Sequence, residues 1–325
     1  MSARVATVAV GAIAIALVLA QDVYPATPLY HSWQYALALA IGLVVLLAYV
    51  NGARRGEDGV AGRRLLVAVL GAAIVDVAGL AAGLLGPDTA QVIGTPGTVT
   101  PIPALGAAAF FGPADAETIA SGDAGIILRR RNAGEIALGG PTRRVLGESL
   151  LYLEPRPAAY VDAYDERGAH LTVTQPTNAS FLSPVLLFHE RQRIGALDVP
   201  LDTFATPARH RIVRALYFSA RDLAQFDHGG GRFDSSAPGL ILSAADDQGR
   251  PLGITLASSG KEVAFAGLRI RMTIGTYPAL AIAAAPPTWA LVIGIALFVA
   301  GCVWSVLRRP RTPLARNVQP RAQGA

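Results

Sequence analysis

Apolar residues gather in four long blocks, separated by segments of ordinary polar composition. The blocks cover residues 5–20, 33–50, 65–85 and 288–307, and the third is the only one with a charged residue, Asp76. A helix needs about 20 apolar residues to cross the hydrocarbon core of a bilayer, with a lower limit of about 17. Lipid offers no partner to free backbone groups, so a crossing segment must be helical. The pattern therefore predicts four transmembrane α-helices, the first at the short end of the range.

Arginines predict the orientation of these helices. Residues 51–64 carry four arginines and residues 308–325 carry five, whereas residues 21–32 carry no arginine or lysine. Loops rich in basic residues stay in the cytoplasm. We therefore expect a multi-pass protein of the plasma membrane, with both termini in the cytoplasm and residues 87–287 outside it.

The first block also fits a second interpretation. Arg4 precedes it, and it ends on Val18-Leu19-Ala20. A short apolar run with these flanks is typical of a cleaved signal peptide. That reading would leave three helices and would keep every other segment on its side of the membrane.

The segment between the third and fourth helices has the pattern of β structure. Residues 86–122 are rich in Gly and Pro and predict an extended connection. Short runs of alternating apolar and polar residues follow, as in residues 268–274, broken by turn sequences such as residues 166–168. One short helix is expected at residues 219–226, with Ser219 as its N-cap.

These patterns predict a mostly antiparallel β domain, a sandwich or open barrel, inserted between helices 3 and 4. The expected organisation is three helices in residues 1–86, the extracytoplasmic β domain in 87–287, the fourth helix in 288–307 and a basic cytoplasmic tail in 308–325.

Composition narrows the classes of function. Of all residues, 52% are hydrophobic, which is too many for a simple soluble enzyme. The single cysteine, Cys302, excludes an intramolecular disulfide, a CxxC redox pair and the CxxCH attachment sequence of a c-type cytochrome. Ten of the 27 arginines flank the predicted membrane helices, which accounts for the basic charge without nucleic-acid binding.

Two residues in the predicted membrane helices carry candidate chemistry. Asp76 stands near the middle of the third helix, where a charge costs a few kcal/mol and often serves a function. The alternative is a protonated or hydrogen-bonded side chain that helps the helices pack. Cys302, in the fourth helix, is a weak candidate for a thiolate ligand of haem iron. A lone cysteine of this kind is otherwise a small apolar filler.

His31 stands at the outer end of the second helix, in Leu29-Tyr30-His31-Ser32-Trp33. A histidine at the membrane interface can ligate iron or move protons, and the alternative is an ordinary interfacial polar residue. The third helix also contains a GxxxG sequence, Gly79 to Gly83, of the kind that lets helices approach closely.

The β segment lacks sequence signs of a catalytic centre. Its four histidines, at positions 170, 189, 210 and 228, have no metal-ligand spacing, and neither a nucleophile elbow nor a phosphate loop is present. We therefore predict no catalytic residues, which argues against a hydrolase or an oxidoreductase that acts alone.

The order of parts over the whole chain resembles the ResB family (Ccs1 in plastids) of cytochrome c maturation proteins. Two places carry the resemblance at residue level. Tyr30-His31-Ser32-Trp33 is similar to the family's sequence at the start of the second helix, and residues 280–311 are similar to its last helix, with Gly294 and Gly301 and a basic end. The β segment is shorter than is usual in the family.

The resemblance implies an accessory role in haem delivery outside the cytoplasm. The partners would be a CcsA/ResC-like haem-handling membrane protein and apocytochrome c, and His31 would be the candidate haem ligand. An alternative of another class is a membrane-anchored β domain that scaffolds or regulates a transporter or envelope enzyme, without a cofactor. A small-solute transporter is less favoured, because four helices with one central charge leave little material for a pathway.

Overall fold

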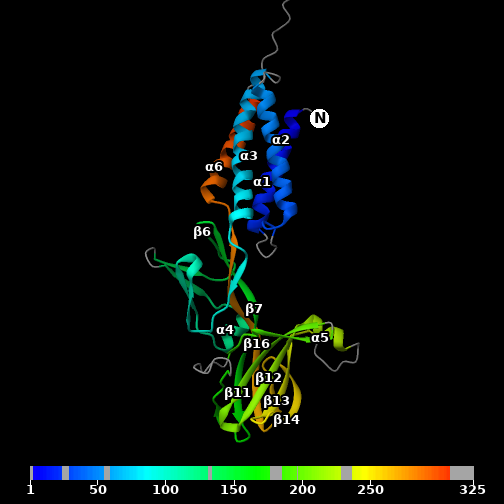
Figure 1. Cartoon of the computed structure of the whole chain (residues 1–325). Helices are drawn as coiled ribbons and strands as arrows, with labels where there is room; N and C mark the ends of the chain where they lie inside the picture. Colours follow the sequence, from blue (N-terminus) through cyan, green and yellow to red (C-terminus); the bar gives the residue numbers. More distant parts are fainter. Residues whose placement is uncertain are drawn as a thin grey trace, which may run out of the picture. The chain divides into compact units, whose positions relative to one another are not determined.

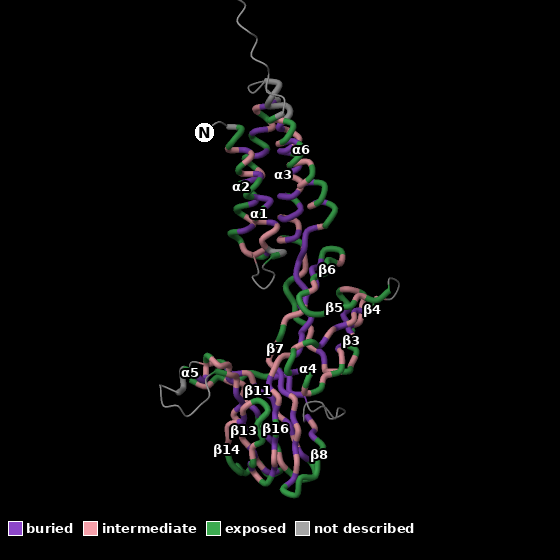
Figure 2. Tube along the Cα trace, turned by 180° about the vertical axis from the view of Figure 1, so that it is seen from behind, coloured by how far each residue is buried: buried purple, intermediate pink, exposed green. Residues whose placement is uncertain are grey.

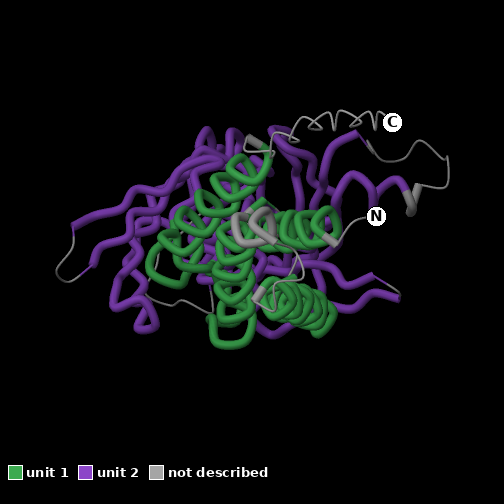
Figure 3. Tube along the Cα trace, turned by 90° about the horizontal axis from the view of Figure 1, so that it is seen from above, with its two compact units in different colours: residues 1–90, 145–150, 282–325 green, residues 91–144, 151–281 purple. Residues whose placement is uncertain are grey.

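The computed structural model describes residues 3–23, 29–54, 59–130, 134–175, 185–195, 197–227 and 236–307. The expected basic tail, residues 308–325, lies outside the described residues. The chain forms two compact units, coloured separately in Figure 3. Unit 1 comprises residues 1–90, 145–150 and 282–325, and unit 2 comprises residues 91–144 and 151–281.

Unit 1 is helical in its main part. Its helices are α1 (Ala3–Val23), α2 (Trp33–Arg54), α3 (Gly59–Leu85) and α6 (Thr288–Leu307), and they are labelled in Figure 1. Among the described residues, three of them, α2, α3 and α6, are long and apolar enough to cross a membrane. The helices predicted from the second, third and fourth apolar blocks are therefore present. The apolar part of α1 is shorter and covers residues 4–20.

The buried positions of α2 form a single narrow stripe. They recur at intervals of four and three residues, at Tyr35, Leu39, Gly42, Leu46, Tyr49 and Ala53. This spacing is the seam of a helix that packs along one line. Large apolar side chains such as Trp33 and Val44 stay exposed on the other faces of α2. An exposed apolar face of this extent is typical of a helix surrounded by lipid.

Helix α3 packs against α1, α2 and α6, and its contact with α6 depends on glycine. A Cβ atom at Gly294 would lie 2.8 Å from the carbonyl oxygen of Gly71, and one at Gly301 would overlap with the backbone of Ala68. The two helix backbones therefore touch with no side chain between them. In a membrane the hydrophobic effect does not drive helices together, and small residues allow the close van der Waals packing that replaces it.

Three sheets form the β part of the chain, and most of their residues belong to unit 2. The first contains β1 (Ala90–Val92), β6 (Arg143–Leu146), β7 (Ser149–Asp165), β8 (His170–Leu171), β9 (Val185–Leu186), β15 (Glu262–Phe265) and β16 (Leu268–Ala284), with the order β1-β16-β7-β6 along its main path. The second runs in sequence order through β10 (Glu190–Ile194), β11 (Leu197–Thr206), β12 (Arg211–Phe218), β13 (Gly239–Asp246) and β14 (Pro251–Ser258). The third runs through β2 (Val99–Ile102), β3 (Ala107–Phe111), β4 (Ile126–Arg130) and β5 (Gly134–Leu138).

The first and second sheets enclose one apolar core. The strands of the second sheet pair in antiparallel fashion throughout, as do β15 with β16 and β7 with β8 and β9. Figure 2 shows buried positions along β16, one of the two longest strands. The core contains side chains from both sheets, among them Val161, Phe204, Val213, Leu242, Ile270 and Met272. The expectation of a mostly antiparallel β fold is confirmed, with a sandwich at its centre.

The extended connection expected at residues 86–122 is more regular than its composition suggests. It contains β1, β2, β3 and a short helix, α4 (Ala116–Ser121). Tertiary contacts order this segment: a Cβ atom at Gly275 of β16 would overlap with the carbonyl of Ile119 in α4. Tyr277 of β16 donates a hydrogen bond of 2.6 Å to the carbonyl oxygen of Gly112.

The helix predicted at residues 219–226 is confirmed. It is α5 (Ala220–Asp227), and the Ser219 side chain accepts a hydrogen bond of 3.2 Å from the backbone N–H of Asp222. The Asp222 carboxylate in turn accepts from the backbone N–H of Ser219 at 3.1 Å. This reciprocal pair is a capping box. Two 3₁₀ turns, Pro103–Leu105 and Pro207–Arg209, complete the elements.

Candidate functional site

The candidate site lies where α2 begins and α3 ends. Ser32 caps α2: its hydroxyl accepts a hydrogen bond of 3.2 Å from the backbone N–H of Tyr35 and donates to the carbonyl of Leu29 at 2.7 Å. A serine cap of this kind fixes the direction in which the chain enters the helix. His31, one residue before the cap, is thereby aimed at the end of α3.

Both ring nitrogens of His31 face backbone carbonyl oxygens. Nδ1 lies 3.1 Å from the carbonyl oxygen of Gly83, in the last turn of α3, and Nε2 lies 3.1 Å from that of Pro87. A neutral imidazole has one donor and one acceptor, so only the ring with both protons can donate to both oxygens. His31 thus fastens the residues that follow α3 to the start of α2.

The GxxxG glycines of α3 make this close approach possible. A Cβ atom at Gly83 would lie 2.5 Å from the carbonyl oxygen of Tyr30, and one at Gly79 would lie 2.9 Å from the Tyr35 hydroxyl. The Tyr30 ring packs on the Tyr35 ring at 5.1 Å, and its hydroxyl donates to the carbonyl of Val18 in α1 at 2.8 Å. The motif therefore brings α1 and the turn before α2 against α3, rather than joining α3 to α6.

Asp76 is sealed inside the helical unit. Its exposed fraction is 0%, and neither carboxyl oxygen has a hydrogen-bond partner among the described residues. A Cβ atom at Gly42 would lie 3.2 Å from its Oδ2 atom, so the glycine in the α2 seam leaves room for the carboxyl group. Burying a polar group without a hydrogen-bond partner costs free energy of folding. Such a carboxyl group is therefore either kept for a function or paired with a group that these residues do not provide.

Cys302 lies far from His31. It packs on the cluster that contains Leu65, Ala68 and Ala72, near the start of α3, whereas His31 contacts Gly83 near the end of α3. The 15 residues from Ala68 to Gly83 correspond to about 22 Å along the helix. The two candidate ligands therefore cannot bind the same iron ion.

The described histidines of unit 2 form no metal centre. His210 pairs with Asp247 at 2.6 Å and His170 with Asp162 at 3.5 Å, all with exposed or partly exposed side chains, and His189 is exposed. In the part of the chain that the structure describes, no group of three His, Cys, Asp or Glu side chains could hold a metal ion. His228 lies outside the described residues.

Asp202 is a buried carboxylate of unit 2 that the sequence does not single out. Asp202 accepts hydrogen bonds from the backbone N–H groups of Leu187 at 2.9 Å and Phe188 at 3.2 Å, and from the Gln175 amide at 3.3 Å. Burial raises the pKa of its carboxyl group, and the Leu187 N–H opposes that rise. Phe188 has a φ of 52°, which is rare for a residue with a side chain. The group holds a strained, buried backbone in place, so its role is structural.

Comparisons of the chain with protein-family models, with curated proteins and with solved structures found no match.

The residues around His31 meet one requirement of a haem ligand and oppose another. A histidine that binds a metal normally donates its second nitrogen to a carbonyl, which fixes the ring, and Nδ1 to Gly83 is such a bond. The other nitrogen, Nε2, contacts the Pro87 carbonyl. Binding through Nε2 therefore requires the ring to release its Nε2 proton and to give up its contact with Pro87. The His31 side chain is exposed to solvent. The ring therefore suits a ligand that holds haem briefly better than one that holds it permanently.

Proposed function

We propose that the chain crosses the membrane four times, with both termini in the cytoplasm and the β domain outside. The arginine distribution supports this orientation. The fit of α1 within unit 1 supports a fourth crossing in place of a cleaved signal peptide: Val18 is fully buried, and its carbonyl holds the Tyr30 hydroxyl. The apolar stretch of α1, residues 5–20, lies just under the lower limit of about 17 residues for a crossing.

We propose that the protein is a ResB-like accessory component of cytochrome c maturation. It would assist haem delivery to apocytochrome c outside the cytoplasm, together with a CcsA/ResC-like haem-handling membrane protein. The observation that supports this most is the setting of His31, an exposed histidine at the extracytoplasmic end of the proposed helices, whose ring is oriented by the Gly83 carbonyl. Haem iron is commonly held by histidine, and delivery requires a site from which it also leaves.

Within this proposal, the chain's own residues bind and orient. The Ser32 cap and the Gly83 carbonyl would hold the imidazole, and the Pro87 carbonyl would receive the Nε2 proton's hydrogen bond whenever the site is empty. When bound, haem would supply an iron centre with a place for one imidazole ligand. Cys302 takes no part, because it lies at the other end of α3.

The test is the absorption spectrum of the detergent-purified protein, co-expressed with any membrane protein encoded by a neighbouring gene. Wild type is compared with His31→Ala and His31→Gln. Glutamine keeps an amide donor for a backbone carbonyl but is a poor iron ligand, so it separates ligation from fastening. His170→Ala, in unit 2, is the matched control for loss of an exposed histidine.

A Soret band that both His31 variants lose, that His170→Ala keeps and that added imidazole restores to His31→Ala would support the proposal. A band that His31→Gln keeps and His31→Ala loses would assign His31 to fastening alone. A wild-type band that no variant changes would place the haem elsewhere. Absence of a band from the folded, partner-bound wild type would reject haem handling.

A second function is favoured by one observation. Both nitrogens of His31 are engaged with backbone carbonyls. This feature suits a membrane-anchored β domain that scaffolds or regulates a transporter or envelope enzyme without a cofactor. Under this alternative His31 is a structural fastener, and the haem spectrum would be blank.

A further inference from the structure

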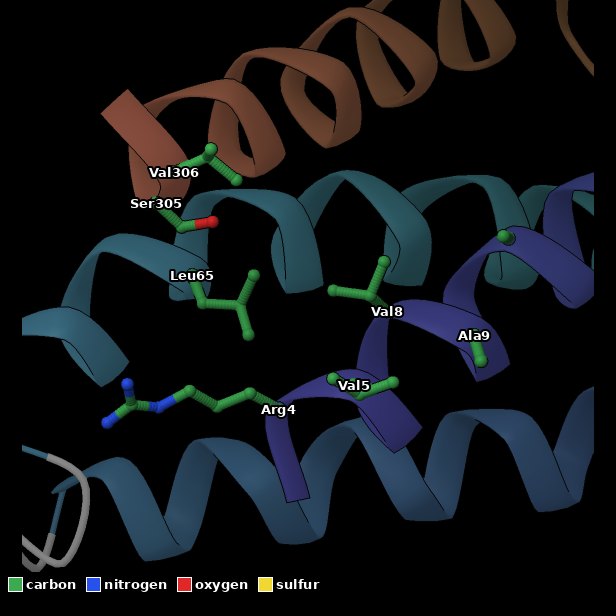
Figure 4. A pocket seen from close by; sticks show the side chains of 8 residues that line it. Arg4, Val5, Val8, Ala9, Leu65, Ser305 and Val306 are labelled. Carbon is green, nitrogen blue, oxygen red and sulfur yellow. The ribbon is translucent and has the colours of Figure 1, made fainter. Parts of the chain in front are cut away.

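A groove opens in the helical unit at the end opposite His31. It has a volume of about 410 Å³ and lies between α1 and α6, over the first turns of α3. Apolar side chains form most of its lining, among them Val8, Ala9 and Ala12 of α1, Leu65 of α3 and Val306 of α6. Arg4 lines it as well. Figure 4 shows the guanidinium of Arg4 pointing toward the side where α3 starts and α6 ends.

The length of the groove excludes a transmembrane helix as its natural occupant. Its lining on α1 runs from residue 4 to residue 12, about 12 Å along the helix axis. On α6 it includes only Ser305 and Val306. A spanning helix would need a seam across the whole hydrocarbon core of about 30 Å, whereas one leaflet is about 15 Å deep. The groove matches one leaflet.

The charge at this end of the helices matches an anion. Residues 1–4, 51–64 and 308–325, which flank the proposed helices on this side, contain ten arginines and two carboxylates, Glu57 and Asp58. Basic sites between transmembrane helices on the cytoplasmic side bind the headgroups of anionic lipids. An apolar groove as deep as one leaflet, with an arginine at its polar end, has the two parts that such a lipid needs.

We propose that this groove binds one anionic phospholipid of the cytoplasmic leaflet. An acyl chain lies against Val8, Ala9 and Ala12, and the phosphate lies at the Arg4 guanidinium. The lipid fills the gap between α1 and α6 and so stabilises the short helix α1. The proposal rests on the membrane orientation of the helices and is independent of haem.

The test is native mass spectrometry of the delipidated full-length protein in detergent, titrated with phosphatidylglycerol or phosphatidylcholine. Arg4→Gln removes the charge, and Ala12→Leu fills the groove. Ala16→Leu adds the same bulk to an exposed position of α1 that does not line the groove and is the matched control. Arg4→Lys keeps the charge.

We expect wild type to retain one phosphatidylglycerol in preference to phosphatidylcholine. Arg4→Gln should weaken that binding about five-fold, as expected for about 1 kcal/mol per basic residue at a membrane surface. Ala12→Leu should abolish binding, whereas Ala16→Leu and Arg4→Lys should keep it. Equal retention of the two lipids by wild type, or a preference that survives both Arg4→Gln and Ala12→Leu, would overturn the proposal. So would a protein partner that co-purifies with wild type and is lost in Ala12→Leu while lipid binding is unchanged.

Discussion

At the scale of single residues, two turns of the β unit have the same construction. In each, an aspartate, Asp165 or Asp246, accepts hydrogen bonds through Oδ1 from the backbone N–H groups two and four residues later. The glycine three residues later, Gly168 or Gly249, has a positive φ. An arginine binds the other carboxylate oxygen at 2.6 Å in both turns. The sequence D-x-x-G is therefore a turn signal with a defined electrostatic part.

These aspartates should make the protein sensitive to acid. The pKa of both carboxyl groups lies below the ordinary value of 3.8, mainly because the N–H four residues later donates to the carboxylate. A lowered pKa in the folded state gives stability that is present above the ordinary value and is lost as the pH falls through the folded-state value. We expect Asp165→Asn and Asp246→Asn to lower the thermal midpoint at pH 7, and the loss to shrink as the pH drops below about 4.

Thermal unfolding followed by circular dichroism in detergent, at a series of pH values, checks this expectation. Asp198→Asn is the control, because its carboxylate is exposed and pairs with one arginine across a hairpin. A difference from wild type that stays constant from pH 7 to pH 3 would contradict the assignment.

Asp76 should cost the helical unit stability. Its carboxyl group is fully buried without a hydrogen-bond partner among the described residues, a situation that costs about 1–3 kcal/mol in proteins. We expect Asp76→Leu to raise the thermal midpoint of the purified protein. If the carboxyl group serves the proposed function, the same variant should lose haem delivery in the presence of the membrane partner. A lower midpoint would mean that the carboxyl has a stabilising partner, and the group would then be structural.

At the scale of elements, the seam between α3 and α6 depends on contact between backbones. A Cβ atom at Gly71 would overlap with backbone atoms of Gly294 and Phe298. We therefore expect Gly71→Val to separate α6 from α3 and to lower the free energy of unfolding by more than about 3 kcal/mol, the upper range of overpacking. Ala296→Val adds bulk to an exposed position of α6 and should have little effect. Chemical denaturation in mixed micelles measures both variants, and equal stabilities would show that the seam is not tight.

The elements differ in how far the sequence predicts them. Apolar blocks of full length predict α2, α3 and α6, because the bilayer imposes their length and composition. The strands in residues 90–111 could not be predicted from the sequence, because this segment is rich in Gly, Pro and Ala. Its order comes from tertiary contacts such as that of Gly94 with the Phe111 ring. His31 was predictable as a candidate from its neighbours. Its carbonyl partners were not, because Gly83 and Pro87 lie 52 and 56 residues away in the chain.

At the scale of the whole molecule, one residue allows the orientation to be measured directly. Lys261 is the only lysine, and it is exposed in the turn that links β14 to β15. The only other amine that a chain starting at Met1 offers is its N-terminus, which the proposed orientation places in the cytoplasm. A membrane-impermeant amine reagent added to intact spheroplasts should therefore label Lys261 alone.

The variant Lys261→Arg makes this result decisive. It should abolish labelling of intact spheroplasts, whereas lysis should restore a signal if the N-terminal amine is unblocked. Labelling of wild type only after lysis would place the β domain in the cytoplasm and would contradict the arginine rule for this chain. Labelling of intact Lys261→Arg cells would put the N-terminus outside. That result is what cleavage of the first apolar block would produce, because the new terminus would then follow Ala20 on the outer side, and α1 would be absent from the mature helical unit.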